Sequence, residues 1–187
     1  MKKVSFHAIS AVLALAVACG AGQDGVPGTT SNPLEAQDRS GENHKGPKKS
    51  GLNCGPVDFG QTGEIEEQLE IAHKSICRYR RIEAALAAGY HDSGLPCEPG
   101  QGYHFIKDEL VGTTDIRHPS VLMYTKDGDL NSPEWIAPQD AFPEPPSIFG
   151  RTMHSEDELG LWILHVWVWK QNSNGVFDDH NPNVTCP

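Results

Sequence analysis

The sequence predicts an α+β domain in which an N-terminal amphipathic helix packs on a mainly antiparallel sheet with long proline-rich loops, stapled by disulfides. Three observations predict this class. Apolar residues recur at helical spacing over residues 65–86, short apolar runs separated by Pro, Gly and Asp follow Gly89, and four cysteines lie in the same part of the chain. We therefore expect a single domain over residues 52–187, which at about 136 residues can enclose a hydrophobic core.

Residues 1–18 have the features of a signal peptide. Two lysines precede an apolar stretch that is about five residues too short to cross a bilayer as a helix. The stretch ends in Ala16-Val17-Ala18, the small-x-small pattern that signal peptidases recognise. With Cys19 the same residues resemble the lipobox of bacterial lipoproteins, in which this cysteine is acylated, for example with palmitate. The sequence favours lipidation of Cys19 and export to the cell envelope, with plain secretion as the alternative.

The cysteine count supports lipidation. The chain has five cysteines, so acylation of Cys19 leaves four, an even number that suits two disulfides in an oxidising compartment. Four cysteines allow three connectivities. We favour Cys54–Cys77, which would pin the segment before the helix, and Cys97–Cys186, which would tie the end of the chain to the loop after the helix. The sequence does not decide between the three.

Composition separates a tether from the domain and excludes some partners. Residues 19–51 contain seven glycines, three prolines and no aromatic residue, which predicts a disordered tether behind the lipid. The net charge is −10, and removal of residues 1–18, which hold two lysines and no acid, makes it −12. Such a chain is unsuited to nucleic acid, and its attachment to a membrane would rest on the lipid. A small ligand or another envelope protein remains as partner.

A helix opens the predicted domain. Its apolar stripe runs at spacings of three and four through Ile65, Leu69, Ala72, Ile76, Tyr79, Ile82 and Leu86. Glutamates crowd the first turns and basic residues the later ones, which complements the helix dipole. Thr62 is expected to cap the start and Gly89 to end the helix in the left-handed conformation, with a break near Tyr79–Arg81 left open.

Strands are predicted after the helix. The candidates are Tyr103–Lys107, Ser120–Lys126, Glu134–Ala137 and Leu161–Lys170, with a tight turn at Asp127-Gly128-Asp129. Residues 138–150 contain four prolines and are expected to form a long loop. The segment Leu161–Lys170 is apolar on both faces, which predicts a central strand covered on both sides.

Histidines are the most suggestive polar residues of the domain. His165 interrupts the apolar run that begins at Leu161, and His104 lies between two aromatic residues. If the two strands are neighbours, both rings could face one pocket, with His154 as a third candidate and a carboxylate from Glu156, Asp157 or Glu158. Such a set would suit Zn or Cu. The spacing of these histidines matches no metal motif. The favoured interpretation is therefore that each is a buried histidine bonded to backbone or carboxylate, followed by a metal site and then by acid–base catalysis.

Three segments carry a resemblance to other proteins. They are Ala87-Ala88-Gly89-Tyr90 with Cys97 and Gly100-Gln101-Gly102-Tyr103-His104-Phe105; Pro119 with Val121-Leu122-Met123-Tyr124; and Leu164-His165-Val166-Trp167-Val168-Trp169 followed by Asn174-Gly175-Val176-Phe177, Asn181-Pro182 and Cys186. Together they resemble a group of small exported bacterial proteins that end in an LHVW-type strand and an NP-x-V-x-C tail.

The resemblance covers about residues 80–187. It implies a shared fold and the Cys97–Cys186 bridge, and it places His104, His154 and His165 at the group's recurrent histidine positions. It implies no activity. The chain departs from the group at Asn172-Ser173-Asn174-Gly175, where Asn-Pro-x-Gly is usual, so the form of this turn is left open.

No sequence motif identifies a reaction. GxSxG, SxxK, CxxC and phosphate-binding loops are missing from the sequence. We therefore favour a non-catalytic, lipid-anchored envelope domain that binds a ligand or partner through a pocket of aromatic and histidine side chains. Trp162, Trp167 and Trp169 could form the floor of that pocket, although a place in the core is favoured. The alternatives are a Cu- or Zn-binding protein that uses His104, His165 and His154, and a histidine-dependent enzyme.

Overall fold

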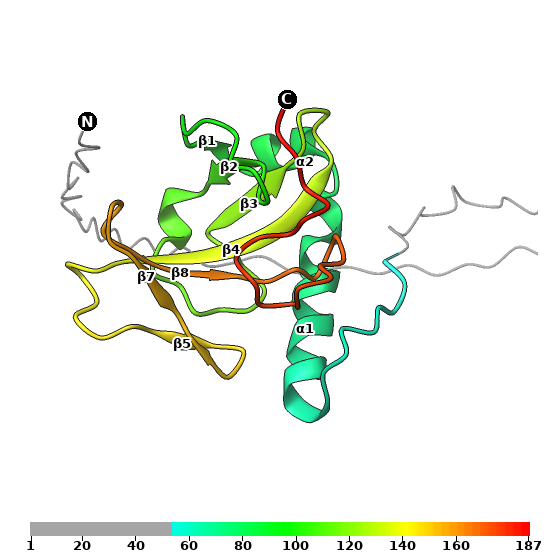
Figure 1. Cartoon of the computed structure of the whole chain (residues 1–187), viewed down its shortest axis with the longest axis horizontal. Helices are drawn as coiled ribbons and strands as arrows, with labels where there is room; N and C mark the ends of the chain where they lie inside the picture. Colours follow the sequence, from blue (N-terminus) through cyan, green and yellow to red (C-terminus); the bar gives the residue numbers. More distant parts are fainter. Residues whose placement is uncertain (1–53) are drawn as a thin grey trace, which may run out of the picture. The chain divides into compact units, whose positions relative to one another are not determined.

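The computed structural model describes residues 54–187, all of which fall in one compact unit. The predicted signal peptide, Cys19 and the tether over residues 19–51 lie outside the described residues. The domain combines helical segments with a mostly antiparallel sheet, which confirms the mixed class predicted from the sequence (Figure 1). Within the described part of the chain, no helix is both long enough and apolar enough to cross a membrane.

The sheet contains six strands in the order β1-β2-β3-β4-β8-β7, and every neighbouring pair is antiparallel. The elements in chain order are α1 (Gly63–Ile76), η1 (Cys77–Tyr79), α2 (Ile82–Ala87), β1 (His91–Asp92), β2 (Tyr103–Ile106), η2 (Asp108–Leu110), β3 (Val121–Tyr124), β4 (Leu130–Pro138), β5 (Ser147–Ile148), β6 (Arg151–Thr152), β7 (His154–Glu156) and β8 (Leu161–His165). Strands β5 and β6 pair separately as a small hairpin at the end of the proline-rich loop.

The helical region is divided into three segments, α1, η1 and α2, because the chain leaves the helix to pair with a turn. Arg81 is extended, with φ of −120°, and forms a bridge with Asp129 beside the turn between β3 and β4. The Leu130 N–H donates to the Arg80 carbonyl, and the Ile82 N–H donates to the Gly128 carbonyl. These bonds to the sheet replace helix bonds and fix the break.

Both ends of the helical region have defined hydrogen bonds. Thr62 occupies the N-cap position of α1, but its side chain makes no capping bond. Instead, the Glu66 carboxylate accepts bonds from the N–H groups of Phe59 and Gln61. At the end of α2, the N–H of Tyr90 donates to Ala85 and that of Gly89 donates to Leu86, with Gly89 at φ 93°. This Schellman motif matches the expected left-handed end of the helix.

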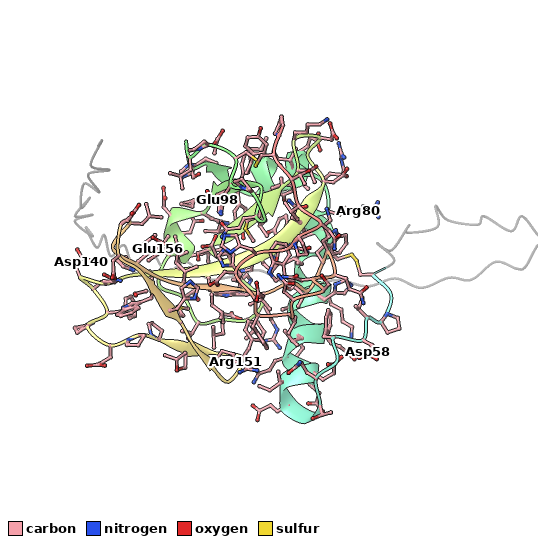
Figure 2. All side chains as sticks on the ribbon, in the orientation of Figure 1. Asp58, Arg80, Glu98, Asp140, Arg151 and Glu156 are labelled. Atoms are coloured by element: carbon pink, nitrogen blue, oxygen red, sulfur yellow. A yellow bond between two sulfur atoms is a disulfide. The ribbon has the colours of Figure 1, made fainter. Side chains whose placement is uncertain are left out.

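Side chains on the two faces of the sheet form two separate cores. The larger core holds Leu69, Ala72 and Ile76 of α1 together with Leu122, Tyr124, Trp135, Ala137, Leu164, Val166 and Val168. The smaller core is on the other face and contains Val121, Met123, Ile136, Ile163, Trp167 and Val184. Side chains fill the space between α1 and the sheet in Figure 2. The face that carries the smaller core also carries the candidate site.

Strand β4 is longer than expected. It begins at Leu130, and it includes Pro133 although proline cannot donate to a ladder. The Pro133 carbonyl accepts a bond from the Val166 N–H, so the proline nitrogen also faces the chain that follows β8. This position lies one residue beyond Glu134–His165, the last pair of β4 with β8, so the missing proline N–H costs the β4–β8 ladder no bond. A bulge at Asn131 shifts the register with β3, since Tyr124 pairs with Leu130 while Met123 pairs with Ser132.

Strand β8 is shorter than expected, because it ends at His165 and not at Lys170. Beyond it, the Val168 N–H donates to the Val166 carbonyl two residues earlier, which turns the chain out of the extended form. Side chains alternate between the two faces of the sheet from Leu161 to Val168. The alternation ends at Trp169, whose ring stacks on that of His73 of α1 at a centroid distance of 5.2 Å.

Two disulfides join the expected cysteines. Cys54 pairs with Cys77 at a Cα separation of 6.0 Å, and Cys97 pairs with Cys186 at 5.8 Å. The first links the segment before α1 to the end of that helix. The second links the loop between β1 and β2 to the end of the chain.

Candidate metal centre

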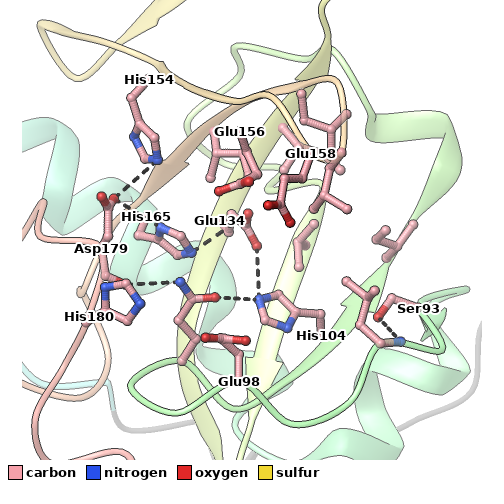
Figure 3. Close-up of a pocket in the computed structure, with 18 of the residues that line it drawn as sticks. Ser93, Glu98, His104, Glu134, His154, Glu156, Glu158, His165, Asp179 and His180 are labelled. Carbon is pink, nitrogen blue, oxygen red and sulfur yellow. Dashed lines mark hydrogen bonds and ion pairs between the residues drawn. The ribbon is translucent and has the colours of Figure 1, made fainter. Parts of the chain in front are cut away.

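Strand pairing brings two of the predicted histidines to one carboxylate. Glu134 of β4 lies directly opposite His165 of β8 in the register. On the other side, Glu134 pairs with Val121 of β3, and His104 of β2 pairs with Met123 two residues along that strand. The side chains of all three residues meet on the face of the sheet that is opposite α1 (Figure 3).

The three side chains present ligand atoms to one another. His104 Nε2 lies 3.7 Å from Glu134 Oε2, and His165 Nε2 lies 3.8 Å from Glu134 Oε1. One ligand atom from each residue lies within 4.8 Å of the other two. Bonds from Zn²⁺ to nitrogen and oxygen are about 2.0–2.2 Å long, so two ligands of one ion lie up to about 4 Å apart. Small side-chain rotations would bring all three atoms to one ion.

These residues form the floor of a cavity of about 450 Å³. Its wall comes from β2, β3, β4, β7 and β8, from the loop between β1 and β2, and from the C-terminal segment. Figure 3 shows Glu156 and Glu158 on the side of the cavity beyond Glu134, and Glu98 beside His104. The cavity is large enough for a small molecule next to the three side chains.

Burial leaves several polar atoms of this site without partners. Glu134 and His165 are each 3 % exposed. Within the described part of the chain, Glu134 Oε2, His104 Nδ1 and both ring nitrogens of His165 have no hydrogen-bond partner. Buried polar groups are nearly always bonded, and an unpaired buried carboxylate is costly. The unpaired atoms are therefore the unusual feature of this site.

The pKa values of the two histidines shift in opposite directions, because burial dominates at His104 and neighbouring carboxylates dominate at His165. Burial lowers the pKa of His104, and the charge of Glu134 offsets only part of that effect. Burial also opposes the charged form of His165, but Glu134 and Asp179 outweigh it and raise the pKa of that ring. The adjacent His165 ring in turn lowers the pKa of Asp179. At neutral pH, the His104 ring is therefore uncharged, which is the form of imidazole that binds a metal ion.

Asp179 links His165 to His154. Its Oδ1 atom lies 3.5 Å from His165 Nδ1 and 3.5 Å from His154 Nε2 (Figure 3). His165 thus presents one ring nitrogen to Glu134 and the other to Asp179. A carboxylate in this position is the usual second partner of a metal-bound histidine, because it fixes the tautomer and the ring orientation.

The loop before β2 places Gln101 beside the site. Gln101 Oε1 lies 3.1 Å from His104 Nε2, and Gln101 Nε2 donates to the Asp179 carbonyl. Asn131, in the bulge of β4, donates its side-chain N–H to the Gln101 carbonyl. Gly102 follows at φ 109°, where a Cβ would lie 2.4 Å from the Tyr124 carbonyl oxygen, so a larger residue does not fit here.

The structure brings together part of the predicted set and adds to it. His104 and His165 converge, whereas His154 is an exposed side chain outside this set, which stacks on the His165 ring at 6.4 Å and shares Asp179 with it. Of the proposed carboxylates, Glu156 and Glu158 line the cavity, and Asp157 is not among the lining residues. The direct partner is Glu134, which the sequence reasoning did not select. A glutamate in an otherwise apolar strand was the available signal.

The tryptophans do not contribute to the cavity. Trp167 is buried in the smaller core, and Trp162 and Trp169 pack against the larger one. None of the three is among the residues that line the cavity, so the alternative of an aromatic floor does not apply to it. Their place in the core, which the sequence favoured, is what the structure has.

Comparisons with known proteins give no match to a family model, to a curated protein or to a solved structure. The resemblance to small exported bacterial proteins therefore stays a prediction, and the argument for function rests on the site itself.

Proposed function

We propose that this protein is an exported, lipid-anchored envelope protein whose domain binds one divalent transition metal ion, Zn or Cu, through His104, Glu134 and His165. Anchoring by Cys19 and export rest on the sequence features of residues 1–19. Metal binding rests on the geometry of the three side chains.

The observation that supports this proposal most strongly is the buried carboxylate of Glu134, whose Oε2 atom has no hydrogen-bond partner among the described residues. A carboxylate that is 3 % exposed, with two imidazole nitrogens 3.7 and 3.8 Å away and no hydrogen-bond donor to Oε2 among the described residues, is stabilised when a cation binds between them. Protonation of His165 is the competing way to balance this charge, but His165 faces Glu134 Oε1 and supplies no hydrogen-bond donor to Oε2.

The donor set indicates the class of metal. Two imidazoles and one carboxylate suit Zn²⁺ and Cu²⁺ better than Ca²⁺ or Mg²⁺, which prefer oxygen ligands alone. Three protein ligands leave a coordination position that faces the cavity, and Gln101 Oε1 is close enough to His104 to approach it. The protein's part is to hold the three donors on strands β2, β4 and β8 of one sheet.

Isothermal titration of the full, chelator-treated chain with Zn²⁺, and separately with Cu²⁺, tests the proposal. We expect one metal ion per chain, and at least a tenfold weaker affinity for the Glu134→Gln variant, which keeps the volume and removes the charge. His165→Ala and His104→Ala are expected to weaken binding similarly. The matched control is His118→Ala, since His118 is exposed and contacts only Asp115.

Circular dichroism of each variant separates loss of binding from loss of folding. Unchanged affinity in a folded Glu134→Gln variant, or failure of the wild-type chain to bind either metal, would refute the metal site and leave Glu134 and His165 as a structural ion pair.

A further inference from the structure

The cavity above the three donors has a strongly acidic wall. Besides Glu134, the carboxylates of Glu98, Glu156, Glu158 and Asp179 line it, and no lysine or arginine is among the described residues that do so. One divalent ion offsets two of these five charges. Three negative charges then remain around a partly enclosed volume, where electrostatic interactions are stronger than in open water.

The lining of the cavity includes two exposed apolar side chains. Leu95 is 41 % exposed and Leu159 is 51 % exposed, and they are two of the three large hydrophobic side chains that the described part of the chain exposes. Both line this cavity, one from the loop between β1 and β2 and the other from the turn between β7 and β8. Exposed apolar side chains at the rim of a pocket mark a place where a ligand buries apolar surface.

We propose that this cavity binds a small organic cation, a protonated amine carried on a short apolar body. The amine would lie near Glu156 and Glu158, which Figure 3 shows beyond Glu134 in the cavity, and the apolar body would contact Leu95 and Leu159. Anionic molecules of the same size are excluded by the acidic wall. The inference takes the metal site of the proposed function as the floor of the cavity, where the ion would oppose the amine, and it rests on the surplus of lining carboxylates over the charge of that ion.

The test compares three probes of matched length, n-pentylamine, 1-pentanol and pentanoate, by calorimetric titration of the zinc-loaded full chain at pH 7. We expect pentylamine to bind at least tenfold more tightly than pentanoate, with pentanol between them. The double variant Glu156→Gln/Glu158→Gln should weaken pentylamine binding at least tenfold and leave the zinc content at one per chain. The control is Glu64→Gln/Glu67→Gln, which removes the same charge from exposed positions of α1.

Three outcomes overturn the inference, and a fourth separates it from the metal site. Tightest binding of pentanoate would show that the metal charge dominates and that the ligand is an anion. A second zinc ion that disappears in the Glu156→Gln/Glu158→Gln variant would show that these carboxylates hold a metal. Absence of pentylamine binding to both zinc-loaded and zinc-free chain would also refute it. Pentylamine binding that depends on Glu156 and Glu158 in a chain that binds no zinc would refute the metal site and support the amine site.

Discussion

Asp179 decides how the central histidine of the site is held. Its carboxylate faces His165 Nδ1 at 3.5 Å and leaves Nε2 directed towards Glu134. Without the Asp179 carboxylate beside Nδ1, the ring could exchange tautomers, and Nε2, the nitrogen proposed to bind the metal, would be protonated part of the time. In the proposed metal site, Asp179 is therefore a positioning residue and not a ligand.

The change Asp179→Asn should weaken zinc affinity by about 10–100-fold while the stoichiometry stays at one ion per chain. Substitution of Co²⁺ for Zn²⁺ gives a second readout, because the visible spectrum of Co²⁺ reports the geometry of its ligands and should change in this variant. The control is Asp140→Asn, an exposed position at the edge of the molecule (Figure 2). Equal zinc affinity in the Asp179→Asn and control variants would remove this role from Asp179.

At the scale of elements, one of the two disulfides joins segments that line the cavity and the other does not. The Cys97–Cys186 bridge joins the loop that carries Glu98 and Gln101 to the segment that carries Asp179. Two backbone bonds reinforce this link, from the Gly100 N–H to the Val184 carbonyl and from the Asn181 N–H to the Gly100 carbonyl. The Cys54–Cys77 bridge lies at the end of α1 and contributes no residue to the cavity wall.

Replacement of Cys97 and Cys186 by serine should therefore weaken zinc binding, whereas replacement of Cys54 and Cys77 should leave it unchanged. Both double variants should lose stability, by roughly 5 and 3 kcal/mol respectively, because the bridges close loops of 89 and 23 residues. Zinc titrations at low temperature, with folding checked by circular dichroism, separate affinity from stability. Equal zinc affinity in the two folded variants would contradict this difference between the two bridges.

Helices and strands with a clear periodicity of apolar residues were predictable from the sequence. The contacts between side chains of different strands were not. The apolar stripe around Leu69 and the alternation from Leu161 to Val168 follow from local sequence and are present in the structure. The meeting of Glu134 with His165 depends on the register of β4 against β8, which the bulge at Asn131 and the bonds of Pro133 help to set. A one-residue slip would place Glu134 on the opposite face, and no local pattern excludes it.

At the scale of the whole molecule, two tyrosine hydroxyls join the helical segments to the sheet and the loop before it. Tyr124 of β3 donates to the Tyr79 carbonyl at 2.8 Å, and Tyr90 donates to the Pro119 carbonyl at 2.7 Å. Burial raises the pKa of both phenols above the ordinary value, with the neighbouring tyrosines adding to the effect. The folded state therefore keeps both groups protonated in a pH range where the unfolded chain ionises them.

The free energy of unfolding should consequently fall as the pH rises above about 10, where unfolded tyrosine releases its proton and the folded groups do not. The raised pKa gives the sign: the stabilisation is complete below the unfolded value and is lost above it. Denaturant unfolding at pH 8, 10 and 11 measures this fall. The Tyr124→Phe variant should lose about 1 kcal/mol at pH 8 and show a shallower fall above pH 10. A fall as steep as that of the wild type would contradict the account.

The central claim is that His104, Glu134 and His165 hold one transition metal ion on the floor of an acidic cavity. X-ray absorption at the zinc edge of the zinc-loaded full chain tests it most directly. We predict a first shell of two imidazole nitrogens and oxygen at about 2.0–2.2 Å, with one imidazole contribution lost in His165→Ala. A first shell with sulfur at about 2.3 Å, or one of oxygen alone, would contradict the claim.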